Sequence, residues 1–207
     1  MSLGQYNASP TRTHLVAAKG VLRYLAGTVE LCLIFSPSNQ SLPSSVQPYT
    51  QACGLSDADW ASDEKDQKSV LGYCFYYFHC LVSWSARKQR TVSTSSTESK
   101  YYALSNTIKE VIWIQLFLSL TQLPSPKTFP ILCHNQSTQS IANTDAISSC
   151  TKHIDVSHHF IREHIANGSF STVWISTSDM IADIFTKPLL HTLFSRHRTS
   201  LGLVPST

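Results

Sequence analysis

Three closely spaced β-prone runs followed by one long helical segment constrain the fold of this chain more than any other feature. The runs are Cys53–Trp60, the aromatic-rich Gly72–Cys80 and Leu81–Ser85, and aromatic and β-branched residues favour strands. Their short spacing predicts an antiparallel meander. From Thr97 to Leu120, apolar residues recur at helical spacing, which predicts a helix whose apolar stripe packs on that sheet.

The rest of this region continues the alternation of strands and helices. Strands are predicted at Phe129–Cys133 and Phe170–Ser176, and helices at Gln136–Asn143, His153–Asn167 and Asp179–Thr186. The element order β, β, β, α, β, α, α, β, α predicts an α/β fold in which helices pack on a mixed sheet.

The first part of the chain has a different character. A helix is predicted at Pro10–Tyr24 and a short strand at Val29–Phe35, and a Ser/Pro/Asn-rich stretch follows. One helix and one strand bury little surface, so we expect residues 1–35 to be the end of something larger. The predicted organisation is then a linker at 36–50, the main domain at 51–190 and a C-terminal tail at 191–207.

Composition excludes several classes of protein. Of 207 residues, 42% are hydrophobic, which favours a packed core over disorder, and the net charge of +3 permits a polyanionic partner without indicating one. The cysteines form no C-x-x-C pair and no signal peptide opens the chain, so we expect an intracellular, reduced protein. The longest apolar stretch, Val111–Leu123, is interrupted by polar residues and too short to cross a bilayer.

Two acidic residues lie in apolar surroundings at opposite ends of the predicted domain. Asp57 falls within a predicted strand, and Asp183 lies among the apolar residues of the last predicted helix. A half-buried carboxylate costs free energy unless a cation faces it, so the two could converge on a divalent metal ion. The alternative is that Asp57 or Asp59 sits at a solvated strand end.

Five motifs occur in one order along the chain: S-D-A-D-W-A-S-D, K-S-V-L-G-Y, S-W-S-A-R-K-Q-R-T-V-S-T-S-S-T-E, T-K-H-I-D-V-S-H-H-F-I-R-E and A-D-I-F-T-K-P-L. Together they resemble the ribonuclease H domain at the C-terminal end of the Pol polyprotein of copia-type LTR retrotransposons. The opening segment P-T-R-T-H-L-V-A-A-K-G-V-L-R-Y-L-A-G-T resembles the end of that family's reverse transcriptase. The resemblance covers nearly the whole chain.

This resemblance implies a ribonuclease H-like fold, with a five-stranded mixed sheet and helices on both faces. It also implies cleavage of the RNA strand of RNA/DNA hybrids by carboxylates that hold two Mg²⁺ (or Mn²⁺) ions. The partners implied are the hybrid and the reverse transcriptase and integrase parts of the same polyprotein. The location implied is cytoplasmic, in a virus-like particle, with a nuclear location as the alternative.

Carried over by motif, the catalytic and metal-binding acids are Asp57 and Asp183, while Lys100 and His134 stand where the family has its other two carboxylates. Four carboxylates give a charge of −4, whereas this set with a neutral histidine gives −1. We therefore expect weak metal binding and little hybrid cleavage. Glu98 is no substitute, because two residues along a helix turn a side chain by about 200°. The alternative is residual activity with one metal ion held by Asp57 and Asp183, with Asp59 assisting.

Several polar residues are candidates for nucleic-acid binding. Basic side chains follow the third predicted strand, and hydroxyls precede the long helix, a combination suited to phosphate oxygens. Two amides could reach the 2′-hydroxyls of RNA. A basic loop of this kind is also often a simple solvated turn. The candidates are Arg87, Lys88, Arg90, Ser95, Ser96, Asn135 and Gln136.

The histidines His153, His158, His159 and His164 do not have the spacing of a helical zinc motif, so we expect them to be surface or packing residues. Three functional hypotheses follow for the chain. The first is a ribonuclease H-like domain impaired in catalysis, the second is a non-catalytic hybrid-binding or protein-interaction module, and the third is a relic without function.

Overall fold

The computed structural model describes residues 3–36, 41–63, 65–134 and 155–206, with only the backbone described at 155–158. The chain forms two compact units. The smaller contains Met1–Ile34 and Leu203–Thr207, and the larger contains Phe35–Gly202. The predicted helix Gln136–Asn143 lies outside the described residues.

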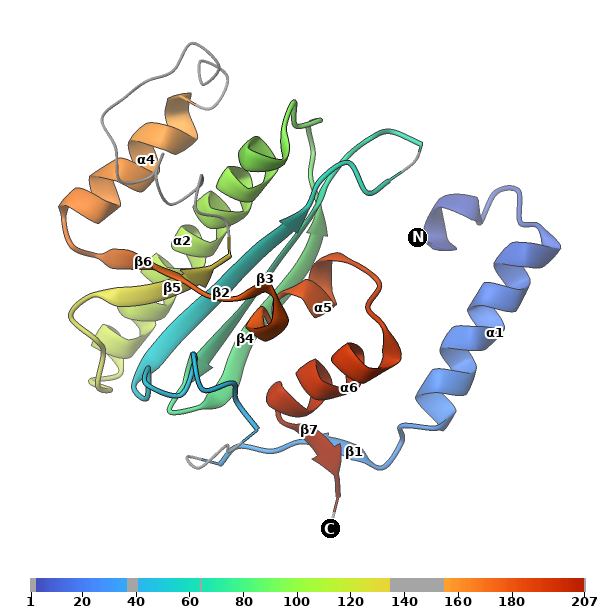
Figure 1. Ribbon diagram of the computed structural model, residues 1–207, viewed down its shortest axis with the longest axis horizontal. Coiled ribbons are helices and arrows are strands. Elements are labelled where there is room, and N and C mark those ends of the chain that lie inside the picture. Colours follow the sequence, from blue (N-terminus) through green and yellow to red (C-terminus); the bar gives the residue numbers. More distant parts are fainter. Residues whose placement is uncertain (1–2, 37–40, 64, 135–154, 207) are drawn as a thin grey trace. The chain divides into compact units, whose positions relative to one another are not determined.

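A five-stranded mixed sheet forms the centre of the larger unit (Figure 1). Its strands are β2 (Ala52–Asp59), β3 (Val70–Tyr77), β4 (Cys80–Lys88), β5 (Phe129–Cys133) and β6 (Phe170–Trp174), in the order β4-β3-β2-β5-β6. The first three strands form an antiparallel meander, and β5 and β6 run parallel to β2. The predicted mixed sheet is confirmed.

Helices cover both faces of this sheet. Tyr73 on β3 donates a hydrogen bond to Glu110 of α2 (Ser96–Leu120), whereas the neighbouring Gly72 lies against Thr186 of α5 (Asp183–Thr186). Adjacent strand residues point to opposite faces, so α2 and α5 lie on opposite sides of the sheet. The helix α4 (Asp155–Ala166) packs beside α2.

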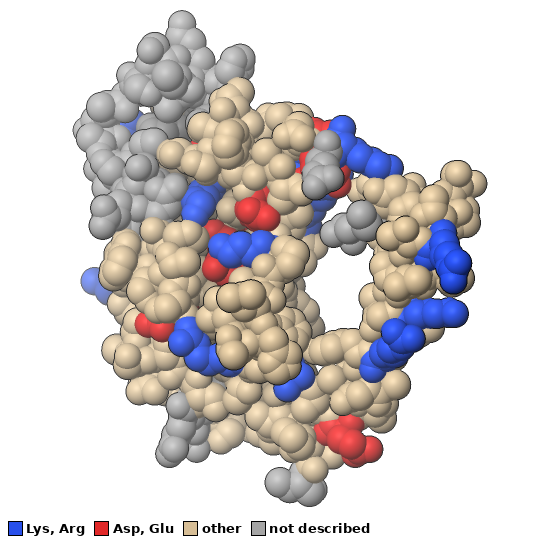
Figure 2. Space-filling model, turned by 45° about the vertical axis from the view of Figure 1, so that its right-hand side comes forward, with Lys and Arg blue, Asp and Glu red and all other residues tan. Residues whose placement is uncertain are grey.

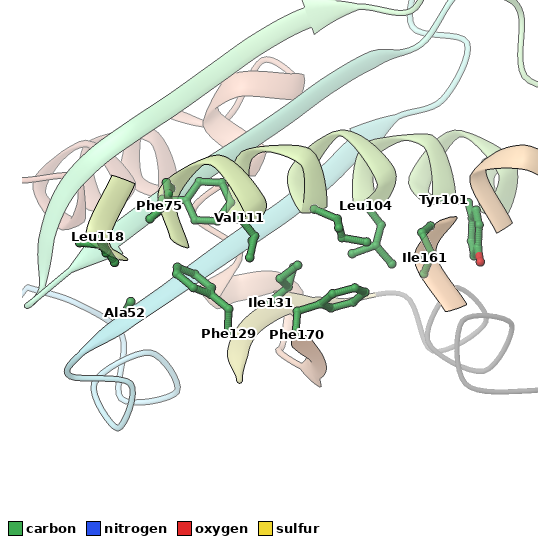
Figure 3. Packing of buried hydrophobic residues seen from close by; sticks show 12 residues of the cluster. Ala52, Phe75, Tyr101, Leu104, Val111, Leu118, Phe129, Ile131, Ile161 and Phe170 are labelled. Atoms are coloured by element: carbon green, nitrogen blue, oxygen red, sulfur yellow. The ribbon is translucent and has the colours of Figure 1, made fainter. Parts of the chain in front are cut away.

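The hydrophobic core lies between α2 and the sheet (Figure 3). The apolar stripe of α2, including Leu104, Ile108 and Val111, packs against the strands as its periodicity predicts. Phe75 of β3 and Phe129 of β5 meet edge to face, with ring centroids 5.7 Å apart. This core fixes α2 over β2, and α2 thereby brings its first turns close to the end of that strand.

Buried side chains and hydrogen bonds also occur within the predicted linker and tail, at residues 41–50 and 191–202. Val46 is fully buried, and the helix α6 (His191–Ser200) buries His197. Ser200 donates a hydrogen bond from Oγ to the Ser41 carbonyl oxygen at 2.7 Å and accepts one at its own carbonyl from the Tyr76 hydroxyl. The sequence of α6 contains only two apolar residues, Leu193 and Phe194, so no apolar periodicity marks this helix.

In the segment before α6, the α-helix is shorter than the sequence predicts. A 3₁₀ turn, η3 (Thr177–Asp179), precedes α5, and only the last turn of the predicted helix Asp179–Thr186 is α-helical. Met180, Ile181 and Ala182 between them are fully buried. The apolar run therefore reflects burial of an irregular connection and not a continuous helix.

The smaller unit contains a short 3₁₀ turn, η1 (Leu3–Tyr6), the helix α1 (Arg12–Ala26) and a two-stranded antiparallel sheet of β1 (Leu31–Leu33) and β7 (Leu203–Pro205). No residue of α1 is buried within the described structure, and Leu22 is 65% exposed. Several large apolar side chains of α1 are thus exposed within the described structure.

Candidate functional site

Asp57 is the centre of a buried polar cluster at the end of β2, where its side chain is 1% exposed. Gly72 pairs with it across β2 and β3. A Cβ at Gly72 would lie 2.7 Å from Thr186 and 2.9 Å from Phe185, so the glycine allows α5 to approach the sheet. This close approach brings Asp183, which is also buried, to Asp57, and Thr186 donates a hydrogen bond from Oγ1 to Asp57 Oδ2 at 2.9 Å.

Lys187 completes this side of the cluster, and the sequence analysis did not identify it. Its Nζ lies 2.8 Å from Asp183 Oδ2 and 3.8 Å from Asp57 Oδ2. The signal was present in the A-D-I-F-T-K-P-L motif, because a lysine four residues after an acid on a helical turn lies on the same face. The ammonium group neutralises charge that burial makes costly.

Lys100 and His134 close the other side. Lys100 Nζ lies 3.4 Å from Asp57 Oδ1 and 2.5 Å from His134 Nε2. An ammonium group only donates hydrogen bonds, so Nε2 of the imidazole accepts, and the hydrogen of the neutral ring is then on Nδ1. Nδ1 lies 3.6 Å from Asp57 Oδ1. Lys100 therefore fixes a tautomer of His134 that turns an N–H group, and not a lone pair, toward the carboxylate.

The two carboxyl groups have opposite pKa shifts. Burial raises the pKa of Asp57, but Lys100, a hydrogen bond from Asp183 and Lys187 together outweigh it, so the pKa is lowered from its usual value. Burial, followed by the charge of Asp57, raises the pKa of Asp183 to about 7 against the opposing effect of Lys187. Burial lowers the pKa of His134 and keeps its ring neutral. At neutral pH the cluster thus holds one firmly ionised acid and one that shares a proton with it.

Ligand atoms of Asp57, His134 and Asp183 lie within 4.8 Å of one another, so the described residues form a cluster of the kind that can hold a metal ion. Its donor set does not fit a pair of hard divalent cations. Only two of these groups are carboxylates, the imidazole presents an N–H, and Lys100 and Lys187 place ammonium groups against the carboxylate oxygens. Cations and N–H groups flank both sides of the acid pair, although Asp57 Oδ1 and Asp183 Oδ1 accept no hydrogen bond.

Glu98 lies apart from this cluster. Its Oε2 accepts hydrogen bonds from the backbone N and the Oγ1 of Thr94, at 2.5 and 2.6 Å. Ser95 in turn accepts a hydrogen bond at Oγ from the Glu98 backbone N at 3.1 Å. These bonds cap the N-terminus of α2, so Glu98 is a buried structural acid that faces away from Asp57.

The structure distributes the nucleic-acid candidates unevenly. Arg87, Arg90 and Ser96 are exposed. Lys88 is engaged by the carboxylates of Asp63 at 2.6 Å and Asp66 at 2.9 Å. Ser95 is occupied as the helix cap described above, and Asn135 and Gln136 lie outside the described residues.

Asp59 and the described histidines of α4 are not among the residues whose ligand atoms meet, although the charges of Lys187, Asp57 and Lys100 act on Asp59. Asp59 is half-buried at the end of β2, and burial raises its pKa. His159 is exposed, and the ring of His164 lies against Phe160 with centroids 4.8 Å apart. His153 and the side chain of His158 lie outside the described residues. Figure 2 shows positive and negative side chains side by side on one face of the molecule, in keeping with the internal pairing of charges.

The order and directions of the strands define the class of the larger unit. An antiparallel meander followed by two strands parallel to the first, with helices on both faces and acids at the end of the first strand, is the arrangement of ribonuclease H. The larger unit is a ribonuclease H-like domain. None of the described helices is long and apolar enough to span a membrane.

The chain is similar to two polyproteins of Arabidopsis thaliana. It is 36% identical to the retrovirus-related Pol polyprotein from transposon RE1 over 201 residues, and 37% identical to that from transposon RE2 over 204 residues. These matches cover 97% and 98% of this chain but 13% of each polyprotein. The chain belongs to the family of copia-type retrotransposon Pol polyproteins and spans a small part of the length of these relatives.

Two other comparisons complete the description. No protein-family model matches the chain. The crystal structure of LC11-RNase H1 in complex with an RNA/DNA hybrid aligns with a TM-score of 0.49 and 11% sequence identity, over 66% of this chain and 94% of that one.

Proposed function

We propose that the larger unit acts as a ribonuclease H-like domain of a Pol polyprotein that does not cleave RNA/DNA hybrids by two-metal hydrolysis. The observation that carries this proposal is the position of Lys100, whose ammonium group lies 3.4 Å from Asp57 and hydrogen-bonds His134. The metals at issue are Mg²⁺ and Mn²⁺, which prefer sites rich in oxygen ligands. This site offers fewer carboxylates and two fixed cations.

The test is cleavage of a labelled RNA/DNA hybrid in Mg²⁺ or Mn²⁺. The unaltered chain is expected to leave the hybrid intact, and the double variant Lys100→Glu/His134→Asp is expected to cleave it. Lys127→Glu/His191→Asp changes the charge by the same amount at exposed positions outside the cluster and should stay inactive. If the unaltered chain cleaves the hybrid and Asp57→Asn abolishes this cleavage, the proposal is contradicted. Residual activity with one metal ion would then be supported. A folded double variant without activity would show that the two substitutions do not account for the loss.

Metal binding can be measured separately from cleavage through thermal stability. A metal ion that binds only the folded state at ten times its Kd stabilises that state by about 1.4 kcal/mol. Mg²⁺ should leave the Tm of the unaltered chain unchanged and should raise that of Lys100→Glu/His134→Asp. An equal rise in both proteins contradicts the proposal.

A second candidate function is hybrid binding without cleavage. It is supported by the exposed Arg87 and Arg90 near the N-terminus of α2, where backbone N–H groups and positive side chains suit phosphate oxygens. A gel shift with a fluorescent hybrid at low salt tests it. Binding that weakens steeply with salt supports this candidate, and the absence of any shift excludes it.

We further propose that the chain works inside the cell together with the reverse transcriptase and integrase parts of the same polyprotein. Its homology to Pol polyproteins supports this. The exposed apolar face of α1 is a surface that such a neighbour could cover. Fractionation of cells that express a tagged chain tests the location: recovery from the cytoplasm or nucleus supports it, and secretion contradicts it. Co-purification with the reverse transcriptase and integrase parts tests the partners, and its absence contradicts them.

A further inference from the structure

A groove lies between α2 and the strands β3 and β4, and none of its lining residues belongs to the Asp57 cluster. Its volume is about 670 Å³. The strand side and its following loop contribute Tyr73, Ser85 and a run of basic and polar residues, and the helix side contributes one face of α2. The lining residues that carry the argument are Arg87, Arg90, Tyr102, Asn106, Lys109 and Trp113.

The groove is strongly positive. Four cations line it, against the single carboxylate of Glu110. That carboxylate is already used, because it accepts hydrogen bonds from the Ser83 hydroxyl at 2.6 Å and the Tyr73 hydroxyl at 3.2 Å. Lys88 is held by two aspartates outside the groove. Arg87, Arg90 and Lys109 therefore outnumber the single lining carboxylate, Glu110, by three to one.

The helix side of the groove carries two aromatic side chains, the half-buried Tyr102 and the exposed Trp113. Tyr102 and Trp113 are eleven residues apart, so they lie on one face of α2 about 16 Å from each other, and Asn106 and Lys109 lie between them on the same face. Trp113 is 57% exposed. One face of its ring is stacked on Phe117, with centroids 5.7 Å apart and an angle of 16° between the planes, and the side chain remains exposed for a base.

This combination of groups selects one class of ligand. Positive side chains along a groove bind a phosphate backbone, and exposed aromatic rings stack on bases. In a duplex the bases already stack on one another, so aromatic side chains in the lining of a groove favour a single strand. An acidic peptide would match the charge but would leave the aromatic faces without planar partners.

We propose that this groove binds a short single-stranded segment of RNA or DNA. Its phosphates contact Arg87, Arg90 and Lys109, and its bases stack on Tyr102 and Trp113. The proposal does not depend on the state of the Asp57 cluster or on the absence of hybrid cleavage.

The test is fluorescence anisotropy with labelled single strands of uridylate or thymidylate of about 12 nucleotides. Stacking of one base is worth about 1–3 kcal/mol, so Trp113→Ala is expected to weaken binding by about 5- to 150-fold. Trp84→Ala is the matched control. Trp84 is 54% exposed, and it follows Ser83, which faces α2, so it points to the opposite face of the sheet. It should leave the affinity unchanged. The uridylate and thymidylate arms show whether RNA or DNA is preferred.

Salt dependence gives a second measure that does not rely on tryptophan. Each phosphate contact contributes a slope of about −0.7 to log K against log salt for single strands. Arg87→Ala/Arg90→Ala should therefore reduce the slope by about 1.4 without changing the Tm. Equal losses for Trp84→Ala and Trp113→Ala, tighter binding of a duplex than of a single strand, or equal competition by polyglutamate would each overturn the proposal.

The outcome is separable from that of the proposed function. Lys100→Glu/His134→Asp should leave single-strand affinity unaltered, because neither residue lines the groove. Loss of single-strand binding in that variant would contradict the placement of the site in the groove. Gain of hybrid cleavage with no single-strand binding in either protein would support the proposed function and refute this one.

Discussion

The larger unit contains two regions with several cations, the Asp57 cluster and the groove beside α2, and they differ in whether these cations are paired with carboxylates. In the Asp57 cluster, Lys100 and Lys187 are mostly buried and each lies against a carboxylate. In the groove, Arg87 and Arg90 are exposed, and the one carboxylate is satisfied by hydroxyl groups. Charge of one sign therefore maintains the fold in the first region and remains available to a ligand in the second.

This difference has a measurable consequence. Removal of one member of a buried ion pair leaves a desolvated charge without a partner, which destabilises the fold. Removal of an exposed cation costs little stability but weakens attraction to phosphates. Substitutions in the cluster should change unfolding, and substitutions in the groove should change binding.

The largest effect is expected for Asp57→Ala. Lys100 would lose its only described carboxylate partner and Lys187 one of two. The free energy of unfolding should fall by about 3–5 kcal/mol in a urea titration. Asp66→Ala is the control and should leave the midpoint nearly unchanged, because the side chain of Asp66 is 39% exposed and Lys88 keeps Asp63 as a partner. A small loss of unfolding free energy for Asp57→Ala would show that the cluster is solvated. The cluster and the groove would then not differ in how their cations affect stability.

Asp183→Asn should change how stability depends on pH. The pKa of Asp183 is raised in the folded state to about 7, so between about pH 4 and pH 7 the folded protein holds a proton that the unfolded chain has lost. Its contribution to stability is therefore greatest below this range and decreases as pH rises through it, by about 1.4 kcal/mol for each pH unit. The asparagine variant should flatten this decline, as measured by denaturation at several pH values. An unchanged slope would mean that Asp183 titrates normally.

Gly72→Ala should disturb the cluster more than the groove, although Gly72 borders the groove as well. The added methyl group meets Thr186 and Phe185 and pushes α5 away from the sheet. A loss of about 1–3 kcal/mol is expected. The unfolding midpoint should fall while the affinity for a single strand is retained. A loss of affinity together with the fall in midpoint would show that the two regions are not independent.

The smallest effect is expected for Glu98→Gln. The side chain caps α2 through Thr94, and loss of such a cap costs about 1 kcal/mol. Because Glu98 faces away from Asp57, this variant should leave metal response and hybrid cleavage as they are in the unaltered chain. A metal-dependent change in Tm on this substitution would place Glu98 in the cluster.

The strand meander and the position of α2 could be predicted because their signals are local and periodic. The run Gly72–Cys80 indicated β3, although this strand ends at Tyr77 and Cys80 already begins β4, and the stripe of α2 indicated the face that this helix buries. Residues 191–200 were predicted to be a tail because Leu193 and Phe194 are the only apolar residues in this stretch, too few for a helical pattern.

In the site, the direction of the Lys100 side chain could be deduced from the sequence, because Lys100 is two residues after Glu98 on a helix. The effect of Lys100 on His134 could not be deduced. That effect depends on a distance of 2.5 Å between two side chains that are 34 positions apart. Lys187 was missed because a lysine after a helical acid is common on solvated surfaces. Only the approach of α5 that Gly72 permits makes it a buried counter-ion.

The hydrogen bond between Ser200 and Ser41 also bears on the order in which the chain assembles. Cys32 on β1 and Val204 on β7 are 172 positions apart, a separation that makes their pairing entropically expensive in an unfolded chain. Folding of the larger unit joins residues 41 and 200, and only a short loop then remains to be closed. Because the entropic cost of closing a loop grows with the logarithm of its length, this lowers the cost of pairing β1 with β7 by about 2–3 kcal/mol. The two-stranded sheet of the smaller unit is therefore expected to form last, after the larger unit has folded.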